Sequence, residues 1–124
     1  MRTLRQVLGD DAEALVTRRL LEEGWSIIGR NVRVGRAEID ILAVDGSAGR
    51  GELVAVEVRW RRRRDYGLPE ETVDRAKLAR LRAAALSLRE GAPLTGVPIP
   101  RLPVRVDVVA VEPGDVVRHH RAVG

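Results

Sequence analysis

Two acidic residues, Asp40 and Glu57, have a spacing that would allow metal chemistry on a phosphodiester. A hairpin closed by the connection Asp45–Gly51 would bring Asp40 across from Val56 or Glu57, with Cβ atoms about 5 Å apart. Two carboxylates at that separation repel each other unless one is protonated or a cation bridges them. Mg²⁺ or Mn²⁺ would relieve the repulsion and could polarise a phosphodiester or activate water. Acids on a hairpin are also common as solvated or arginine-paired residues, so the spacing alone leaves both interpretations open.

Strand alternation indicates which neighbours share a face with these acids, because residues two apart point to the same side of a strand. Both acids occur in segments that are otherwise mostly apolar. The first segment places Glu38, Asp40 and Leu42 on one face. The second segment places Leu53, Ala55, Glu57 and Arg59 on one face, and Val54, Val56 and Val58 on the other.

The basic residues are almost all arginine, and one run of them follows the second acidic segment. The chain has 22 basic residues, of which Lys77 is the one lysine, and its net charge is +4. A general excess of arginine is typical of codon bias in a GC-rich genome. The run Arg61–Arg64 is a better functional indication, because adjacent guanidinium groups would neutralise several phosphates whatever the base sequence. The alternative for this run is a solvated loop.

The rest of the sequence predicts the elements that would position these residues. The length of 124 residues fits a single domain, residues 1–124. Apolar periodicity and Val-rich runs predict the order α-β-β-β-α-β with a further short strand, hence an α/β or α+β domain with helices flanking a mixed sheet. The predicted helices are Asp10–Glu23 and Glu70–Arg89; the predicted strands are Trp25–Val34, Glu38–Val44, Glu52–Arg59, Val104–Val111 and Val116–His120.

Five ordered motifs match the pattern of a known family. The central one is Ala37-Glu38-Ile39-Asp40 followed by Val56-Glu57-Val58-Arg59, which resembles Gly-Glu-Ile-Asp followed by Val-Glu-Val-Lys. The chain therefore resembles the YraN family of endonuclease-like proteins, which has a restriction-endonuclease-like fold and resembles archaeal Holliday-junction resolvases. The other matching segments are Glu13-Ala14 with Gly24-Trp25, Asn31-Val32-Arg33, Tyr66-Gly67 with Pro69-Glu70, Val73 and Lys77, and Arg105-Val106-Asp107-Val108-Val109.

The resemblance implies a metal site made by Glu13, Asp40 and Glu57. The lysine that the family pattern uses to orient or deprotonate the attacking water is replaced here by Arg59. Arginine supplies positive charge but stays protonated, so it cannot act as a general base. If this replacement limits a nuclease, Arg59→Lys should increase cleavage. The amine of Lys77 would compete for the same role if its helix approaches the site.

Other positions have supporting roles in this interpretation. Glu38 belongs to the motif and is expected to support the metal ligands. Lys77 and Arg61, Arg62, Arg63 and Arg64 are expected to contact nucleic acid, while an ordinary surface position remains the alternative for Lys77. His119 and His120 are expected to be tail residues without a catalytic role.

Composition limits the remaining classes of protein. The absence of cysteine excludes disulfides and thiolate zinc sites. No segment reaches the roughly 18 apolar residues of a membrane helix, and the N-terminus lacks the apolar stretch of a secretory signal, so we expect a cytoplasmic protein without a membrane partner. The scarcity of aromatic residues argues against a base-stacking platform of the single-strand-binding kind. The aromatic residues are Trp25, Trp60 and Tyr66.

The sequence thus predicts a Mg²⁺- or Mn²⁺-dependent, endonuclease-like protein that binds nucleic acid and acts on DNA phosphodiesters, with branched DNA among the candidate substrates. One alternative is a catalytically weakened or inactive DNA-binding module on the same fold. Another is a basic module that docks an acidic protein. Nothing in the sequence decides between a monomer and a homo-oligomer.

Overall fold

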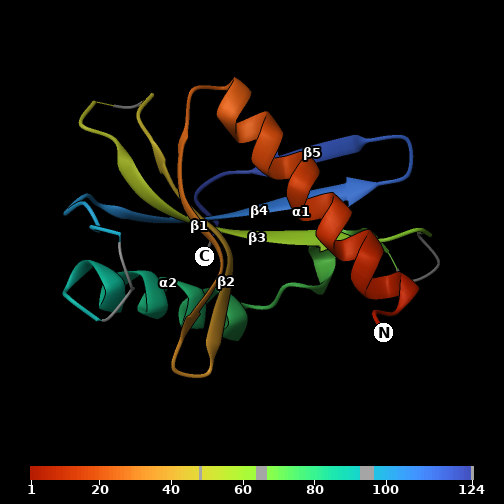
Figure 1. Ribbon diagram of the computed structural model, residues 1–124, viewed down its shortest axis with the longest axis horizontal. Coiled ribbons are helices and arrows are strands. Elements are labelled where there is room, and N and C mark those ends of the chain that lie inside the picture. Colours follow the sequence, from red (N-terminus) through yellow and green to blue (C-terminus); the bar gives the residue numbers. More distant parts are fainter. Residues whose placement is uncertain (48, 64–66, 93–96, 124) are drawn as a thin grey trace.

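A mixed five-stranded sheet carries a helix on each face in the computed structural model, which describes residues 1–47, 49–63, 67–92 and 97–123 (Figure 1). Helix α1 spans Leu4–Glu22 and α2 spans Arg75–Arg89, with a short 3-10 helix, η1, at Pro69–Thr72. The strands are β1 Ser26–Val34, β2 Ala37–Asp45, β3 Glu52–Trp60, β4 Val104–Glu112 and β5 Val116–His120. The predicted mixed α+β architecture is confirmed.

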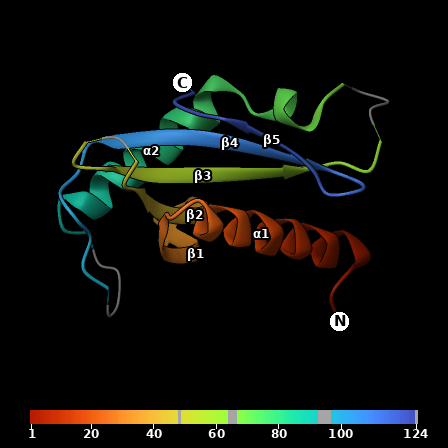
Figure 2. The ribbon, with the colours of Figure 1, turned by 90° about the horizontal axis from the view of Figure 1, so that it is seen from above.

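The order of strands in the sheet is the order in the sequence, β1-β2-β3-β4-β5. All neighbours are antiparallel except β3 and β4, which are parallel. A parallel pair needs a crossover connection, and η1 and α2 lie in the connection between these two strands. Figure 2 shows α1 on one side of β3 and β4 and α2 on the other. The central strands are therefore covered on both faces.

Each helix covers a separate apolar cluster, and β3 divides its side chains between them. Val54 and Val56 pack on the α1 face, and Leu53 and Ala55 pack on the α2 face. By alternation, Glu57 and Arg59 continue the α2 face, whereas Val58 and Trp60 pack against the cluster under α1. The helix residues buried in these clusters are Ala12, Val16 and Leu20 of α1 and Leu81, Ala84, Ala85 and Leu88 of α2.

Helix α1 begins six residues before the predicted start at Asp10, which corrects the prediction. Thr3 caps the helix by accepting a hydrogen bond from the backbone N–H of Gln6 at 3.1 Å. The side chain of Gln6 in turn accepts from the backbone N–H of Thr3 at 2.8 Å. This reciprocal capping box satisfies two N–H groups that a helix end otherwise leaves without partners. The added turns bring Arg5 and Gly9 to the edge of the acidic site described below.

The second helical segment is also corrected, because Glu70–Arg89 is not one helix. Pro69 begins the short helix η1, and Asp74 then starts α2 by accepting a hydrogen bond from the backbone N–H of Lys77 at 2.8 Å. The break at Val73 and Asp74 has extended backbone angles. As a result, Lys77 lies in the first turn of α2, at the end of the helix nearest the acids.

A third correction concerns the alternation in β2. Ile39 packs with Leu42 on the α2 face, whereas Ile41 packs on the α1 face, so strict alternation fails between Ile39 and Ile41. The ladder between β2 and β3 extends only from Asp45 to Ile41. Beyond it, β2 pairs with β1 alone, and two-stranded ribbons twist more strongly than wide sheets. The predicted shared face of Glu38, Asp40 and Leu42 is therefore not regular.

A buried ionic network anchors the C-terminal strands to the sheet. Asp107 is fully buried and accepts two hydrogen bonds from Arg105, each 2.9 Å long. Arg105 also contacts Asp45 at 3.0 Å, and its guanidinium lies 5.3 Å from the ring centre of Trp25. Burial opposes ionisation of Asp107, but hydrogen bonds from His119, Arg105 and a backbone N–H outweigh burial and lower its pKa.

We expect Arg105→Met to destabilise the fold by about 3–5 kcal/mol, because it would remove the buried arginine that two buried carboxylates, Asp45 and Asp107, share. Urea unfolding of the variant measures this loss. The matched control is Arg2→Met, which removes an exposed ion pair with Asp10 and should cost no more than about 1 kcal/mol. Equal, small losses in both variants would contradict the structural role of Arg105.

Candidate active site

The site lies where β2 separates from β3. Their ladder ends at the pair Ile41 and Val56, so Asp40 and Glu57 occupy the next positions along the two strands. The side chain of Asp40 accepts a hydrogen bond from the backbone N–H of Val58 at 2.8 Å. A carboxylate oxygen thus satisfies a strand N–H that the β2 backbone no longer reaches. The fork that results holds a cavity of about 280 Å³.

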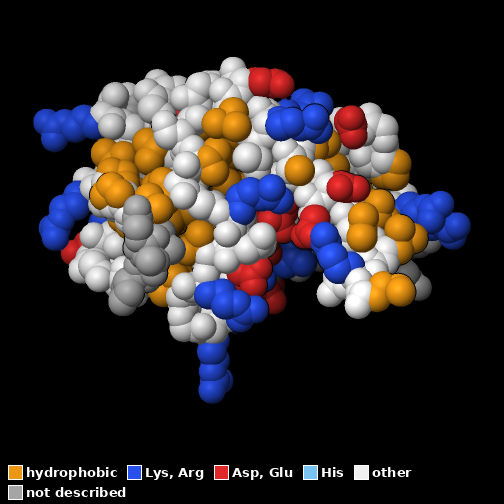
Figure 3. Space-filling model, viewed as in Figure 1, with side chains coloured by type: hydrophobic (Ala, Val, Ile, Leu, Met, Phe, Trp, Pro, Cys, Tyr) orange, Lys and Arg blue, Asp and Glu red, His pale blue; other side chains and the backbone are white. Residues whose placement is uncertain are grey.

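The cavity receives side chains from both helices and from β3. Figure 3 shows acidic side chains gathered in a hollow beside α1, with basic side chains around it. Glu13 enters from α1 and Lys77 from α2, although these helices cover opposite faces of the sheet. The fork is therefore open toward both faces. The other residues lining the cavity are Arg5, Gly9, Asp40, Glu57, Val58, Arg59 and Trp60.

Asp40 and Glu57 form a close carboxyl pair, as the hairpin prediction required. They lie on neighbouring antiparallel strands and line the same cavity, so the geometric expectation is confirmed. Burial and, after it, the hydrogen bond and charge of Glu57 together raise the pKa of Asp40 from 3.8 to about 8, against the lowering effect of the Val58 N–H. Near neutral pH this pair therefore holds a proton.

Glu13 shares the cavity but is held toward β1. Its carboxylate lies 3.6 Å from the guanidinium of Arg30. Burial raises the pKa of Glu13; Arg30 opposes the shift, while Glu38 and Glu57 add to it. With its amide nitrogen toward the acids, Asn31 lies 3.2 Å from both Glu13 and Glu38 and donates to each.

The predicted metal ligands Glu13, Asp40 and Glu57 come together only in part. Among the described residues, no three Asp, Glu or His side chains are grouped closely enough to hold a metal ion. Asp40 and Glu57 are paired, whereas Glu13 belongs to the same cavity without joining the pair. Glu38 lies two residues before Asp40 in β2, where it accepts a hydrogen bond from Asn31 and lies 3.3 Å from Arg33.

Two cations converge on one oxygen of Glu57. Arg59 Nη2 lies 3.0 Å and Lys77 Nζ lies 3.3 Å from Glu57 Oε2. The Arg59 Nε is buried and has no hydrogen-bond partner among the described residues. About a third of each cationic side chain remains exposed, 32% for Arg59 and 34% for Lys77. The one lysine of the chain thus stands beside the arginine that occupies the motif's lysine position.

The predicted arginine run continues directly from β3. Arg61, Arg62 and Arg63 line a second cavity of about 440 Å³ together with Leu4, Arg5, Leu8 and Trp60. Arg64 lies outside the described residues. Because Arg5 and Trp60 line both cavities, the described part of the run borders the acid site.

The structure corrects the prediction that His119 and His120 are tail residues. Both belong to β5, where His119 Nε2 lies 2.7 Å from Asp107 and His120 Nε2 lies 2.8 Å from Glu70. Arg118 pairs with the same Glu70 through two contacts, 2.7 and 2.8 Å long. The contacts to Glu70 hold η1 against β5, the His119 contact joins β5 to β4, and none of these residues lines the acid cavity.

Sequence reasoning missed Arg5, Asn31 and Trp60 as residues of the site. The capping pattern from Thr3 to Gln6 would have extended α1 and brought Arg5 into consideration. Asn31 is one of the few non-glycine residues with a positive φ, 52°, which asparagine tolerates better than most residues. No local sequence pattern indicates that Asn31 bridges two acids or that Trp60 lies at the site.

The donor set fits a divalent cation in its chemistry. Asp40, whose pKa is raised by burial and by Glu57, and Glu57 beside it present oxygen ligands of the kind Mg²⁺ and Mn²⁺ prefer. Replacing the proton that this pair holds by a cation would remove the cause of the raised pKa.

No helix in the described part of the chain combines the length and hydropathy of a membrane span.

Comparison with known proteins agrees with the motifs. The model of an uncharacterised protein family, UPF0102, matches residues 12–111. The chain belongs to the UPF0102 family. A UPF0102 protein of Symbiobacterium thermophilum is 46% identical over 108 residues, which are 86% of this chain and 83% of that protein. A UPF0102 protein of Paenarthrobacter aurescens is 42% identical over 107 residues, covering 86% and 81% of the two chains.

UPF0102 is the family that the sequence motifs indicate under the name YraN. Among solved structures, the SfsA protein of Pyrococcus furiosus in complex with Ca²⁺ is similar at a TM-score of 0.34 and 17% identity. The match covers 97% of this chain and 64% of that one, so this chain spans less than two thirds of SfsA.

We expect Asp40→Asn to stabilise the metal-free UPF0102 protein increasingly as pH rises. A pKa raised from 3.8 to about 8 means that the folded state favours the protonated acid. The wild type therefore keeps this contribution fully below pH 3.8 and loses it as pH rises toward 8, whereas asparagine never ionises. Thermal unfolding in a chelator should show a melting temperature roughly 2–8 °C above wild type at pH 9, and little difference at pH 4.

The matched control is Glu38→Gln, at a side chain that is 39% exposed. Its effect on the melting temperature should change little over the same pH range. If the difference in melting temperature between Asp40→Asn and the wild type is also independent of pH, the raised pKa of Asp40 is contradicted.

Proposed function

We propose that this protein is a metal-dependent endonuclease that cleaves phosphodiester bonds in DNA. The observation that carries the proposal is the pair of Asp40, which is partly buried, and Glu57, which is buried beside two cations. A purely structural acid pair would gain from separate arginine partners, as Asp107 does from Arg105. In the acid cavity, by contrast, the Asp40 carboxyl keeps a raised pKa, and the cavity around it stays open to solvent.

The roles follow from the contacts. Asp40 and Glu57 would hold Mg²⁺ or Mn²⁺, and Glu13, which lines the same cavity, would have to move toward the pair to assist. When bound, such a cation would neutralise charge on the phosphodiester and assist attack by water. Arg59 and Lys77 would stabilise the negative charge that develops on phosphorus oxygens, and Lys77 is the one of the two that can also give or take a proton. The exposed arginines after β3 would bind neighbouring phosphates.

One observation favours a second candidate, a DNA-binding module that has lost most of its activity. Arg59 occupies the lysine position of the family motif, and a guanidinium cannot replace an amine as a proton carrier. The same cavity and arginine run would then retain nucleic acid without cutting it. Docking of an acidic protein on the basic surface is a further alternative, which competition with DNA would separate from both.

The first test is cleavage of labelled linear, flapped and four-way DNAs with Mg²⁺, with Mn²⁺ and with a chelator. We expect products only with a divalent cation. Glu57→Gln keeps the size of the side chain but removes its charge, and should lower the rate by at least about 100-fold, as loss of a group central to metal and charge stabilisation does.

The control for this test is Glu52→Gln, a β3 acid that contacts Arg105 rather than the cavity. Its cleavage rate should remain within a few-fold of wild type. Retention of DNA by the wild type with no cleavage of any substrate would favour the binding module. Cleavage by Glu57→Gln at the wild-type rate would point to a contaminating nuclease and sink the proposal.

A second test concerns the two cations on Glu57. We expect Lys77→Met to lower cleavage by roughly 10²–10⁴-fold if its amine moves a proton. Arg59→Lys should raise cleavage modestly in the wild type, which already has an amine at the site, and should rescue Lys77→Met in the double variant. DNA binding is measured alongside, so that loss of a phosphate contact is distinguished from loss of chemistry. Full activity of Lys77→Met would remove Lys77 from the mechanism.

A further inference from the structure

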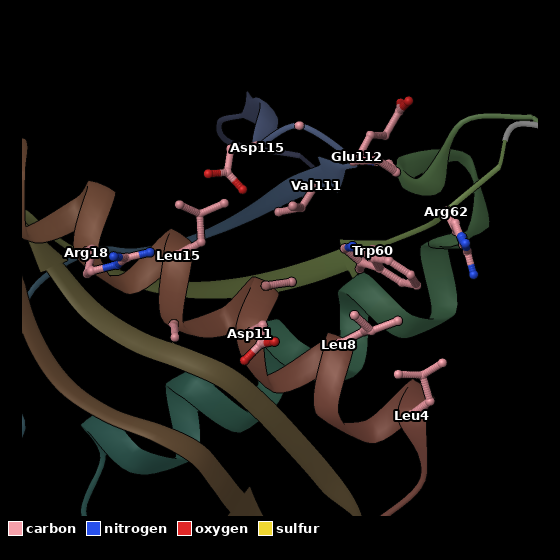
Figure 4. Close-up of a pocket in the computed structure, with 14 residues that line it drawn as sticks. Leu4, Leu8, Asp11, Leu15, Arg18, Trp60, Arg62, Val111, Glu112 and Asp115 are labelled. Carbon is pink, nitrogen blue, oxygen red and sulfur yellow. The ribbon is translucent and has the colours of Figure 1, made fainter.

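Trp60 is the one described aromatic residue at the acid site, and it also borders two neighbouring cavities. It is the last residue of β3, lines the acid cavity, and lines the 440 Å³ cavity that contains Arg61–Arg63. It also borders a groove of about 600 Å³ between α1 and the β4–β5 turn. Figure 4 shows Trp60 between Leu8 of α1 and Arg62, with Leu4 below. The side chain is only partly buried, although it packs against the cluster under α1.

We infer that the cavity around Trp60 is a subsite for one unpaired nucleotide next to the bond that is cut. This inference rests on the proposed function and names its substrate class, a strand that is single-stranded at the cleavage point. The volume of about 440 Å³ lies in the ~300–1,000 Å³ range of small-ligand pockets. The lining combines an indole and two leucines with arginines, which suits a base and its phosphate together.

The charge of the lining favours a nucleotide over an uncharged apolar ligand. Four arginines line the cavity: Arg5 of α1 and, after β3, Arg61, Arg62 and Arg63. An apolar peptide segment would leave these cations without partners, whereas phosphates on both sides of a base would pair with them. Trp60 and Arg5 also line the acid cavity, so the strand could pass from the base subsite to the acids without interruption.

The requirement for an unpaired base follows from stacking. A base inside a continuous duplex has both faces covered by its neighbours, so a tryptophan can stack on it only after it is displaced from the helix. Stacking of an aromatic side chain on a base adds affinity for single strands with little dependence on sequence. One tryptophan at the cutting point is not the extended stacking platform that the scarcity of aromatic residues excludes. It would instead select flaps, splayed ends or unpaired positions at junctions.

The test compares binding of a duplex with a single-stranded flap and of a continuous duplex of equal length, in a chelator so that nothing is cut. Trp60→Leu keeps an apolar side chain but removes the aromatic face, and should weaken flap binding by roughly 5- to 100-fold while changing duplex binding less than about 2-fold. Trp60→Phe should recover most of the flap affinity. An abasic nucleotide at the first flap position keeps the phosphate and should reproduce the loss with the wild type.

Fluorescence gives a second reading of the same contact. The flap should quench emission of the wild type and not of Trp60→Leu, because the other tryptophan, Trp25, is 4% exposed and belongs to the Arg105 network. The triple variant of Arg61, Arg62 and Arg63 to Ser should weaken both DNAs about equally and reduce the salt dependence of binding.

The possible outcomes separate this subsite from the proposed function. If Trp60→Leu loses equal affinity for both DNAs, or none, or if the abasic flap binds as well as the intact one, the subsite is overturned even if the protein cuts. If tryptophan emission changes with protein concentration in the absence of DNA, a second copy of the chain covers the cavity around Trp60. That outcome would also overturn the subsite. Selective loss of flap binding in a protein that never cuts would support the subsite and reject the nuclease.

Discussion

The site depends on one constraint: the carboxyl groups of Asp40 and Glu57 are held side by side at the fork between β2 and β3. β2 stops pairing with β3 after Ile41, and Asp40 then uses its carboxylate to satisfy the N–H of Val58. That bond holds Asp40 against Glu57, in surroundings where burial disfavours two adjacent negative charges. The fork also opens the sheet toward both faces, so that residues of α1 and α2 can reach one cavity.

A comparison of the two acidic clusters of this protein shows how differently the same residue types can be used. Asp107 is completely buried, yet its bonds to Arg105 and His119 lower its pKa. Asp40 is less buried, yet burial together with the neighbouring Glu57 raises its pKa to about 8. The first cluster is satisfied internally and stabilises the fold. In the second cluster both cations contact Glu57, and Asp40 keeps its raised pKa, which is the electrostatic condition that a bound divalent cation would meet.

Local patterns in the sequence predicted the part of the site that lies on one hairpin. A short connection and Val-rich alternation were enough to place Asp40 beside Glu57 on paired strands, because hairpin register depends on nearby residues. The same logic failed at Ile39, where pairing with β3 ends and the ribbon twists. It also missed the start of α1, although the capping pattern of Thr3 and Gln6 is local.

Contacts between distant segments could not be predicted in this way. Lys77 reaches Glu57 because Asp74 ends the extended segment after η1 and starts α2 at that point. Trp60 reaches Leu8 because α1 crosses the end of β3, and Asn31 reaches Glu13 across the gap between β1 and α1. Each of these depends on how whole elements pack. The periodicity of a single segment carries no information about that packing.

The most direct measurement of the central claim is a carboxyl NMR titration of protein labelled with ¹³C at aspartate, with Asp40→Asn used to assign the Asp40 signal. Without metal, the account predicts that Asp40 titrates near pH 8, far above the ordinary 3.8. With saturating Mg²⁺, the titration should move below roughly pH 5, because the cation replaces the shared proton. An Asp40 signal that titrates near pH 4 and does not respond to Mg²⁺ would contradict the account.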